Sequence, residues 1–185
     1  VQIKRERRAL EDEGIVIRVS HGSTLPDALF SPMFQLYKAT IDKFYWGQQY
    51  LNLACFDLLR QRWKHRLCFF TAEREGTLLA GTFTVRKNTA LYGRYWGAFE
   101  AVRYLHFNLC YYASIEYCLQ EGLTHFEPGA GGEYKHVRGF EACPTNSMHY
   151  LADDRFDAAV SEYLQQERDA VQQEMQWYEQ QSALK

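Results

Sequence analysis

The feature that most constrains this sequence is a series of three β-rich runs joined by short links. The runs are Leu67 to Ala72, Thr77 to Val85 and Ala90 to Trp96. Glu75-Gly76 and Lys87-Asn88 supply turn residues between them. Such short links predict antiparallel pairing, because a parallel crossover needs a dozen or more residues. The centre of the chain is therefore expected to form a β-meander.

The segment after the meander predicts a strand of a different kind. Residues 103–121 are apolar nearly all round, which is typical of a helix buried against a sheet, and Gly122 is well placed to end it. Leu123 to Glu127 then reads as a further strand. Strands that pair locally and are then interrupted by a crossover helix indicate an α+β fold with a mixed sheet.

Helices are expected at both ends of the chain as well. Near the N-terminus we predict helices at residues 3–13, 27–44 and 52–63, and a short strand at residues 15–19. In the last of these helices, which Asn52 is expected to cap, Leu53, Phe56, Leu59 and Trp63 recur at helical spacing. Near the C-terminus we expect a strand at 143–151 and an amphipathic helix at 155–181. That helix would be roughly 40 Å long, so we expect it to overhang the domain or to dock onto a partner, and a homodimer is one option.

Composition and charge limit the function classes. The 185 residues are 46% hydrophobic and 16% aromatic, which excludes a disordered chain. The net charge is -2, so no global field draws the protein toward nucleic acid. A basic cluster at residues 4–8 is followed by Glu11, Asp12 and Glu13, which favours a solvated helix face.

The cysteines and histidines predict no metal site. The five cysteines include no CxxC pair, and the six histidines show no HxxxH pattern. Reduced thiols favour a cytoplasmic location. No apolar run is long enough to cross a bilayer, and we expect no membrane partner. The sequence opens at Val1 inside a charged, helix-like stretch, so we expect a segment upstream of it.

The strongest candidate for chemistry is the glycine-rich segment EPGAGGEYKHVRGF, residues 127–140. Its glycines, Gly131 and Gly132 among them, let a backbone approach a ligand and expose N–H groups as an oxyanion nest. Lys135 and Arg138 add positive charge for a carbonyl oxygen or a carboxylate. The segment also contains two carboxylates that are candidate bases for an attacking amine, Glu127 and Glu133. The alternative is a flexible surface loop with incidental charges.

Two further candidate residues each have a structural explanation as the alternative. Arg94 lies with Tyr95 in the run LYGRYWG, where a half-buried guanidinium would bind a carboxylate or phosphate of a substrate. The alternative for Arg94 is a structural ion pair with Glu100 or Glu116. His106 lies in the first turn of the buried helix, where it is a candidate base or a satisfied core histidine.

The run LYGRYWG, the run YLHFNLCYY at residues 104–112 and the glycine-rich segment, in that order, resemble the bacterial predicted N-acyltransferases of the peptidoglycan biosynthesis/recognition type. These are relatives of the Fem-type peptidyltransferases within the GNAT superfamily. The resemblance covers nearly the whole chain. It implies one GNAT-like domain over residues 1–185, forming the C-terminal half of a longer two-domain protein.

The resemblance also implies a placement for the substrates. In a GNAT-like fold two central strands splay and the acyl donor lies between them, here residues 90–96 and 123–127. The Fem-type pattern of a glycine pair, a lysine and Gly-Phe matches residues 131–132, Lys135 and residues 139–140. Lys135 would then hold the reacting carbonyl or the acceptor.

The acyl donor stays open. The glycine-bearing loop that cradles the pyrophosphate of coenzyme A in GNAT enzymes is matched only near Arg94, Gly97 and Ala98, because Phe99 occupies the last small position. Either acyl-CoA or aminoacyl-tRNA could be the donor, with a small-molecule or peptide amine as acceptor and no metal.

The favoured function is an N-acyltransferase that moves an acyl or aminoacyl group onto an amine of a peptidoglycan-related precursor. The predicted catalytic residues are Lys135, Glu133, Glu127 and His106. The predicted substrate-binding residues are Arg94, Tyr95, Gly131, Gly132 and Arg138. The alternatives are a non-catalytic module that recognises a cell-wall precursor or peptide, and an assembly domain that acts through its closing helix.

Overall fold

A computed structural model describes residues 2–43, 48–129 and 133–181 of the chain. The chain divides into two compact units, residues 1–129 and 130–185. One domain over the whole chain stays a prediction.

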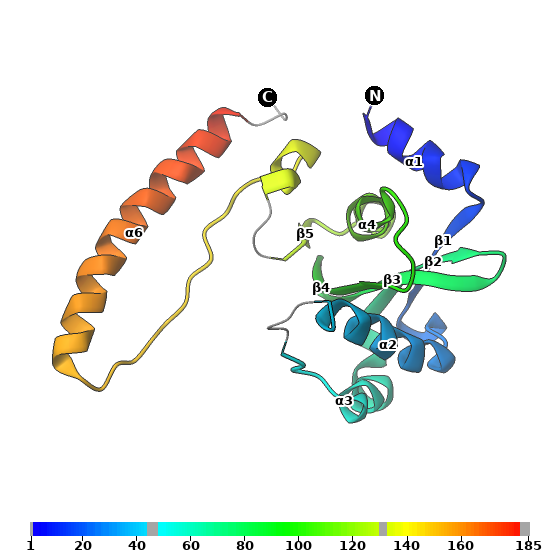
Figure 1. Ribbon diagram of the computed structural model, residues 1–185, viewed down its shortest axis with the longest axis horizontal. Helices are drawn as coiled ribbons and strands as arrows, with labels where there is room; N and C mark the ends of the chain where they lie inside the picture. Colours follow the sequence, from blue (N-terminus) through cyan, green and yellow to red (C-terminus); the bar gives the residue numbers. More distant parts are fainter. Residues whose placement is uncertain (1, 44–47, 130–132, 182–185) are drawn as a thin grey trace. The chain divides into compact units, whose positions relative to one another are not determined.

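The first unit is built on a five-stranded sheet with the order β1-β2-β3-β4-β5. The first four strands pair antiparallel, and β5 pairs parallel with β4. The predicted meander and the predicted mixed sheet are therefore confirmed. The strands are β1 (Ile15–His21), β2 (Leu67–Arg74), β3 (Thr77–Lys87), β4 (Ala90–Ala98) and β5 (His125–Glu127) (Figure 1).

Helices cover both faces of this sheet (Figure 1). One face carries α2 (Phe30–Ile41) and α3 (Leu53–Leu58), and it encloses a cluster that includes Phe30, Leu36, Phe56 and Phe69. The other face encloses a second cluster that includes Leu10, Phe70, Leu91 and Leu109. Its helices are α1 (Gln2–Asp12), α4 (Leu105–Phe107) and α5 (Ala113–Gln120), with a π-helical turn at Asn108–Tyr112 between the last two.

Helix α3 continues into a π-helical turn at Leu59–Trp63. Asn52 caps the helix, since its side chain accepts a hydrogen bond from the Cys55 amide at 2.9 Å. Of the apolar residues at helical spacing, Phe56 is buried, whereas Leu53 and Trp63 are exposed. Within the wider π turn each residue advances less about the helix axis, so that Trp63 at its end leaves the face that α-helical spacing predicts.

Helix α1 is held to the crossover helix by buried polar groups. Glu6 is only 1% exposed, and its carboxylate accepts a hydrogen bond from the Tyr112 hydroxyl. The Asn108 side chain donates to the Glu6 carbonyl oxygen at 3.1 Å. Because a buried carboxylate is stable only when it is hydrogen-bonded, these contacts determine where α1 lies.

The second unit holds a short 3-10 helix, η6 (Glu133–Arg138), and the long helix α6 (Asp154–Gln180). Asp153 caps α6, accepting hydrogen bonds from the amides of Arg155 and Phe156. The strand predicted at residues 143–151 is wrong, since this segment has no regular secondary structure. Nearly all of its side chains are exposed, and Pro144 has no N–H to give to a ladder.

Within the described residues, no helix is long and apolar enough to cross a membrane.

Candidate functional site at the divergence of two strands

The central feature of the first unit is the place where β4 and β5 separate. Their parallel pairing covers only three positions and ends where Tyr92 meets Glu127. From residue 93 to residue 98, β4 continues without a partner strand on that side among the described residues. An unpaired strand edge exposes backbone N–H and C=O groups, so the divergence is a place where a carbonyl compound could be hydrogen-bonded.

A β-bulge coincides with this divergence. On the β3 side of β4, Thr84 pairs with Gly93 and Phe83 with Tyr95, so Arg94 is an extra residue without an opposite partner. A bulge bends its strand and redirects a side chain. Arg94 is exposed there, which differs from the half-buried position predicted for it.

The structural ion pair considered for Arg94 is wrong. The Glu100 carboxylate pairs with Arg74 at 2.6 Å, and the Glu116 carboxylate pairs with Arg7. Arg94 forms no ion pair within the part of the chain that the structure describes. An exposed guanidinium at a bulge remains available to bind an anionic group of a substrate.

Tyr95 and His106 lie on opposite faces of β4. The ring of Tyr95 meets Tyr37 edge-on at 4.6 Å on the α2 face, where burial raises the pKa of its hydroxyl. The His106 ring packs on Trp96 at 5.1 Å, among side chains of the α4 face. The structure therefore does not bring these two predicted site residues together in one wall.

Glu127 ends β5 directly at the divergence. Its carboxylate accepts a hydrogen bond from the Gly129 amide at 3.1 Å, which fixes the turn that follows the strand. The next residue of that turn, Pro128, lies so close to Gly93 that a Cβ on the glycine would be 3.3 Å from its backbone. Glu127 thus holds the backbone where β4 and β5 separate, and its role as a base stays a prediction.

Helix α2 stabilises the free edge of β4. The Thr40 hydroxyl donates to the Trp96 carbonyl oxygen at 2.7 Å, replacing a ladder partner. The Tyr37 hydroxyl, which is buried, accepts hydrogen bonds from the amides of Tyr50 and Leu51, each at 3.0 Å. Sequence reasoning missed both Tyr37 and Thr40, because isolated tyrosine and threonine residues in a helix carry no motif.

The remaining predicted site residues belong to the second unit. Lys135 and Arg138 lie in η6, and the Arg138 guanidinium donates to the Tyr134 carbonyl oxygen at 3.1 Å. Gly139 ends the helix with φ +86, a conformation that favours glycine. The backbone of Glu133 begins η6, whereas Gly131 and Gly132 lie outside the described residues. That these residues converge with Glu127 and Arg94 stays a prediction.

His136 is a feature of η6 that sequence reasoning used only to exclude a metal site. Its ring lies 5.1 Å from that of Tyr178 in α6. Both ring nitrogens are shielded from solvent and have no hydrogen-bond partner in the described part of the chain. This contact joins η6, which carries Lys135, to the last turn of α6.

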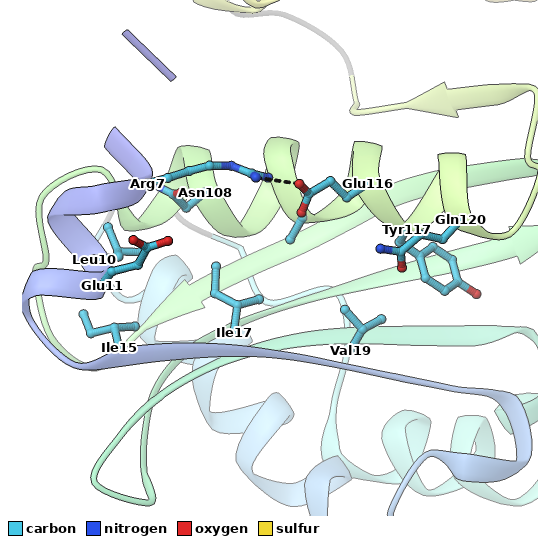
Figure 2. Close-up of a pocket in the computed structure, with 11 residues that line it drawn as sticks. Arg7, Leu10, Glu11, Ile15, Ile17, Val19, Asn108, Glu116, Tyr117 and Gln120 are labelled. Carbon is cyan, nitrogen blue, oxygen red and sulfur yellow. Dashed lines mark ion pairs between the residues drawn. The ribbon is translucent and has the colours of Figure 1, made fainter. Parts of the chain in front are cut away.

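A separate pocket of about 260 Å³ lies at the opposite edge of the sheet (Figure 2). Ile15, Ile17 and Val19 of β1 line it, and the ion pair between Arg7 of α1 and Glu116 of α5 crosses it. None of the predicted site residues lines this pocket. It is therefore distinct from the β4–β5 divergence.

The described residues offer neither a reactive cysteine at Cys110 nor a group of metal ligands. Burial raises the pKa of Cys110 to about 12, so its thiol is protonated at neutral pH. Among residues 2–43, 48–129 and 133–181, no three histidine, cysteine or acidic side chains are grouped to hold a metal ion.

Solved structures define the class of this fold. L-PGS from Bacillus licheniformis matches with a TM-score of 0.52 and 10% identity over 70% of this chain and 40% of that one. A structure described as "a possible acetyltransferase" from Clostridium difficile 630 matches with a TM-score of 0.51 and 12% identity, over 76% of this chain and 99% of that one. The fold is thus the GNAT-like acyltransferase fold predicted from the sequence. This chain spans less than half the length of the first of these proteins.

The family follows from the sequence as a whole. The profile of the FemAB-like family, described as peptidoglycan biosynthesis/recognition, matches residues 1–185. The chain belongs to this family, as its three motifs predicted. No curated protein matches it.

Proposed function

We propose that this chain transfers an acyl or aminoacyl group onto an amine, and that the reacting carbonyl lies where β4 and β5 diverge. Family membership and the acyltransferase fold support a transferase of this class. The observation that carries the proposal is the free edge of β4 from residue 93 to residue 98, with its bulge at Arg94.

The chemistry is an attack of the amine nitrogen on the acyl carbonyl carbon. The carbon–nitrogen bond forms, and the carbonyl oxygen gains negative charge in a tetrahedral intermediate. Backbone N–H groups along the unpaired edge of β4 would stabilise that charge, together with the Lys135 ammonium. Collapse of the intermediate expels the donor's leaving group, and the amine gives up its proton to Glu127, Glu133 or His106, directly or through water.

We also propose which molecules serve as donor and acceptor. We infer that the donor is an acyl-CoA or an aminoacyl-tRNA, and that the acceptor is the amine of a peptidoglycan-related precursor, in line with the description of the family. The exposed guanidinium of Arg94 would orient a carboxylate of the acceptor beside the donor.

The experiment compares acyl transfer with binding. The full chain is incubated with acetyl-CoA, or with tRNA charged with a radiolabelled amino acid, and with a muropeptide that carries a free amine. Lys135→Ala should reduce turnover by about a hundredfold, the loss expected for one oxyanion donor, while leaving the fold intact. Lys87→Ala, which removes an exposed lysine at the end of β3, is the matched control and should change nothing.

Two results would argue against the proposal. Turnover that survives in Lys135→Ala would remove the lysine from the reaction. Tight binding of the muropeptide with no transfer from any donor would instead favour the non-catalytic recognition module.

A further inference from the structure

The surface of residues 50–66, which comprise α3 and the segments on either side of it, combines exposed apolar and cationic side chains. Four of the large hydrophobic side chains that the first unit exposes fall within residues 50–63. They are Tyr50 at 77% exposure, Leu53 at 46%, Leu58 at 50% and Trp63 at 54%. Scattered exposed hydrophobics are ordinary, but four on one short segment mark an interaction surface.

The same segment concentrates positive charge. The chain as a whole carries 21 basic and 23 acidic side chains. Residues 53–66 carry four arginines or lysines against the single carboxylate of Asp57. This stretch is therefore strongly cationic within a chain of negative net charge.

Ion pairs neutralise only the inward half of that charge. Arg60 and Lys64 both pair with Asp27, at 3.1 and 2.5 Å, and Arg60 also lies 3.7 Å from Asp57. Arg62 and Arg66 are exposed and make no ion pair with any described residue. Exposed His65 lies between Lys64 and Arg66.

We propose that residues 50–66 dock the protein onto an anionic lipid surface. The arginines would meet lipid phosphates while Leu58 and Trp63 enter the headgroup region, which is how an interfacial helix binds. The expectation of no membrane partner rested on the lack of a spanning segment, and surface docking needs none. This inference does not depend on the proposed acyl transfer.

The apolar side chains select lipid over other anionic partners. RNA is bound through phosphate contacts and through stacking on flat aromatic or guanidinium groups, so exposed leucines such as Leu53 and Leu58 would contribute little to it. Tryptophan and leucine both gain by entering the boundary between headgroups and acyl chains. The π-helical turn at 59–63 brings Trp63 to the exposed side and so completes the surface.

The test is co-sedimentation of the full chain with vesicles. We expect binding to vesicles that are half phosphatidylglycerol and half phosphatidylcholine, and little binding to phosphatidylcholine alone. Raising the salt to about 0.5 M should release the protein, because screening weakens contacts between exposed charges. The tryptophan emission should shift to the blue on binding, and Trp63→Phe should lose that shift.

Two charge-reversal variants give a matched comparison. Arg62→Glu/Arg66→Glu should lower the partition coefficient by at least about tenfold, since each cation near an anionic surface contributes severalfold. Arg5→Glu/Arg8→Glu makes the same change in net charge on α1 and should bind nearly as well as the parent. Leu58→Ala should weaken binding, whereas Leu119→Ala, at a residue 74% exposed on α5, should not.

Several outcomes would overturn the proposal. Equal losses in the two charge-reversal variants would reduce the effect to net charge. A lack of vesicle binding, together with binding of a fluorescent RNA that depends on Arg62 and Arg66, would assign the surface to nucleic acid. A dimer in light scattering that Leu58→Glu dissociates would assign it to a second copy of the chain.

Discussion

Gly97 of β4 lies so close to Leu36 of α2 that a Cβ at residue 97 would be 1.9 Å from the Leu36 carbonyl oxygen. Gly97 comes four residues after the point where β4 and β5 separate, and Thr40 of the same helix binds the neighbouring Trp96 carbonyl. The close approach therefore fixes the free edge of β4, on which the proposed reaction depends.

Gly97→Ala should destabilise the protein by about 3 kcal/mol or more, because the added methyl group meets backbone that cannot rotate away. Gly81→Ala is the matched control on the adjacent strand. Its Cβ would meet the Met33 sulfur at 2.7 Å, and a methionine side chain can move, so we expect about 1 kcal/mol. Urea unfolding measures both values. Equal costs would show that α2 can shift.

Thr40→Val should cost about 1 kcal/mol, since it leaves the Trp96 carbonyl without its hydrogen bond while keeping the shape of the side chain. Thr40→Ser keeps the hydroxyl and is the control. Denaturant titration gives the stability of each variant. A Thr40→Val protein as stable as the parent would mean that water replaces the hydroxyl.

Tyr112→Phe should destabilise the protein by about 2 kcal/mol, because the buried Glu6 carboxylate loses a donor. Glu6 still accepts from the Gln2 side chain, which limits the loss. Tyr150→Phe, at a residue that is 90% exposed, should have no effect. Amide hydrogen exchange should show faster opening of α1 in Tyr112→Phe alone. Equal protection of the α1 amides in the parent and in Tyr112→Phe would contradict the role of this hydrogen bond in holding α1.

Thiol labelling should separate the five cysteines into two groups. Burial raises the pKa of Cys68 and Cys110 to about 12 and that of Cys118 to about 11, so these three should resist alkylation at pH 8. Cys143 is exposed and Cys55 partly so, and both should react. Cys110 is also partly exposed as a residue, but burial of its thiol keeps the thiol protonated at pH 8. Mass spectrometry of the folded protein should therefore count two adducts, and five after unfolding.

The same pKa shifts predict loss of stability at alkaline pH. The unfolded thiols ionise near 9, whereas burial keeps the folded ones protonated. The unfolded state thus loses protons first as the pH rises, and the free energy of unfolding should fall between about pH 9 and pH 12. Replacing Cys68 with Ala should flatten this dependence. A urea-unfolding midpoint that stays constant over this pH range would contradict the raised pKa values of the buried thiols.

Local rules predicted much of the sheet and the helix ends. Asn88 and Gly76 adopt the positive φ values, 53 and 77, that the turn positions require. Gly122, with φ 64, ends the crossover helix as expected. These positions could be predicted because the chain's own sterics decide them.

Predictions that depended on long-range contacts were less accurate. Arg74, which lies on a different strand, takes the Glu100 carboxylate that Arg94 was considered to bind, and no local pattern contains that information. The π turn likewise leaves Trp63 exposed, although helical spacing groups it with the buried Phe56. The sequence pattern therefore did not indicate the exposed surface that Trp63 forms with Arg62 and Arg66. At the candidate site, sequence motifs located Glu127 and Arg94 at the divergence but could not show that β4 separates Tyr95 from His106.

The π-helical turn at Asn108–Tyr112 amounts to one residue inserted into an otherwise α-helical crossover. Upstream of the insertion the helix presents Leu105 to the sheet, and downstream it presents Tyr117, whose ring meets Phe70 at 5.7 Å. Deleting a single residue there would restore α-helical geometry and keep Leu105 and Tyr117 facing the sheet, whereas a deletion elsewhere in the helix would turn every later side chain by roughly 100° about the helix axis. A single deletion should therefore be tolerated at this turn, whereas the α-helical parts of the crossover should accept none.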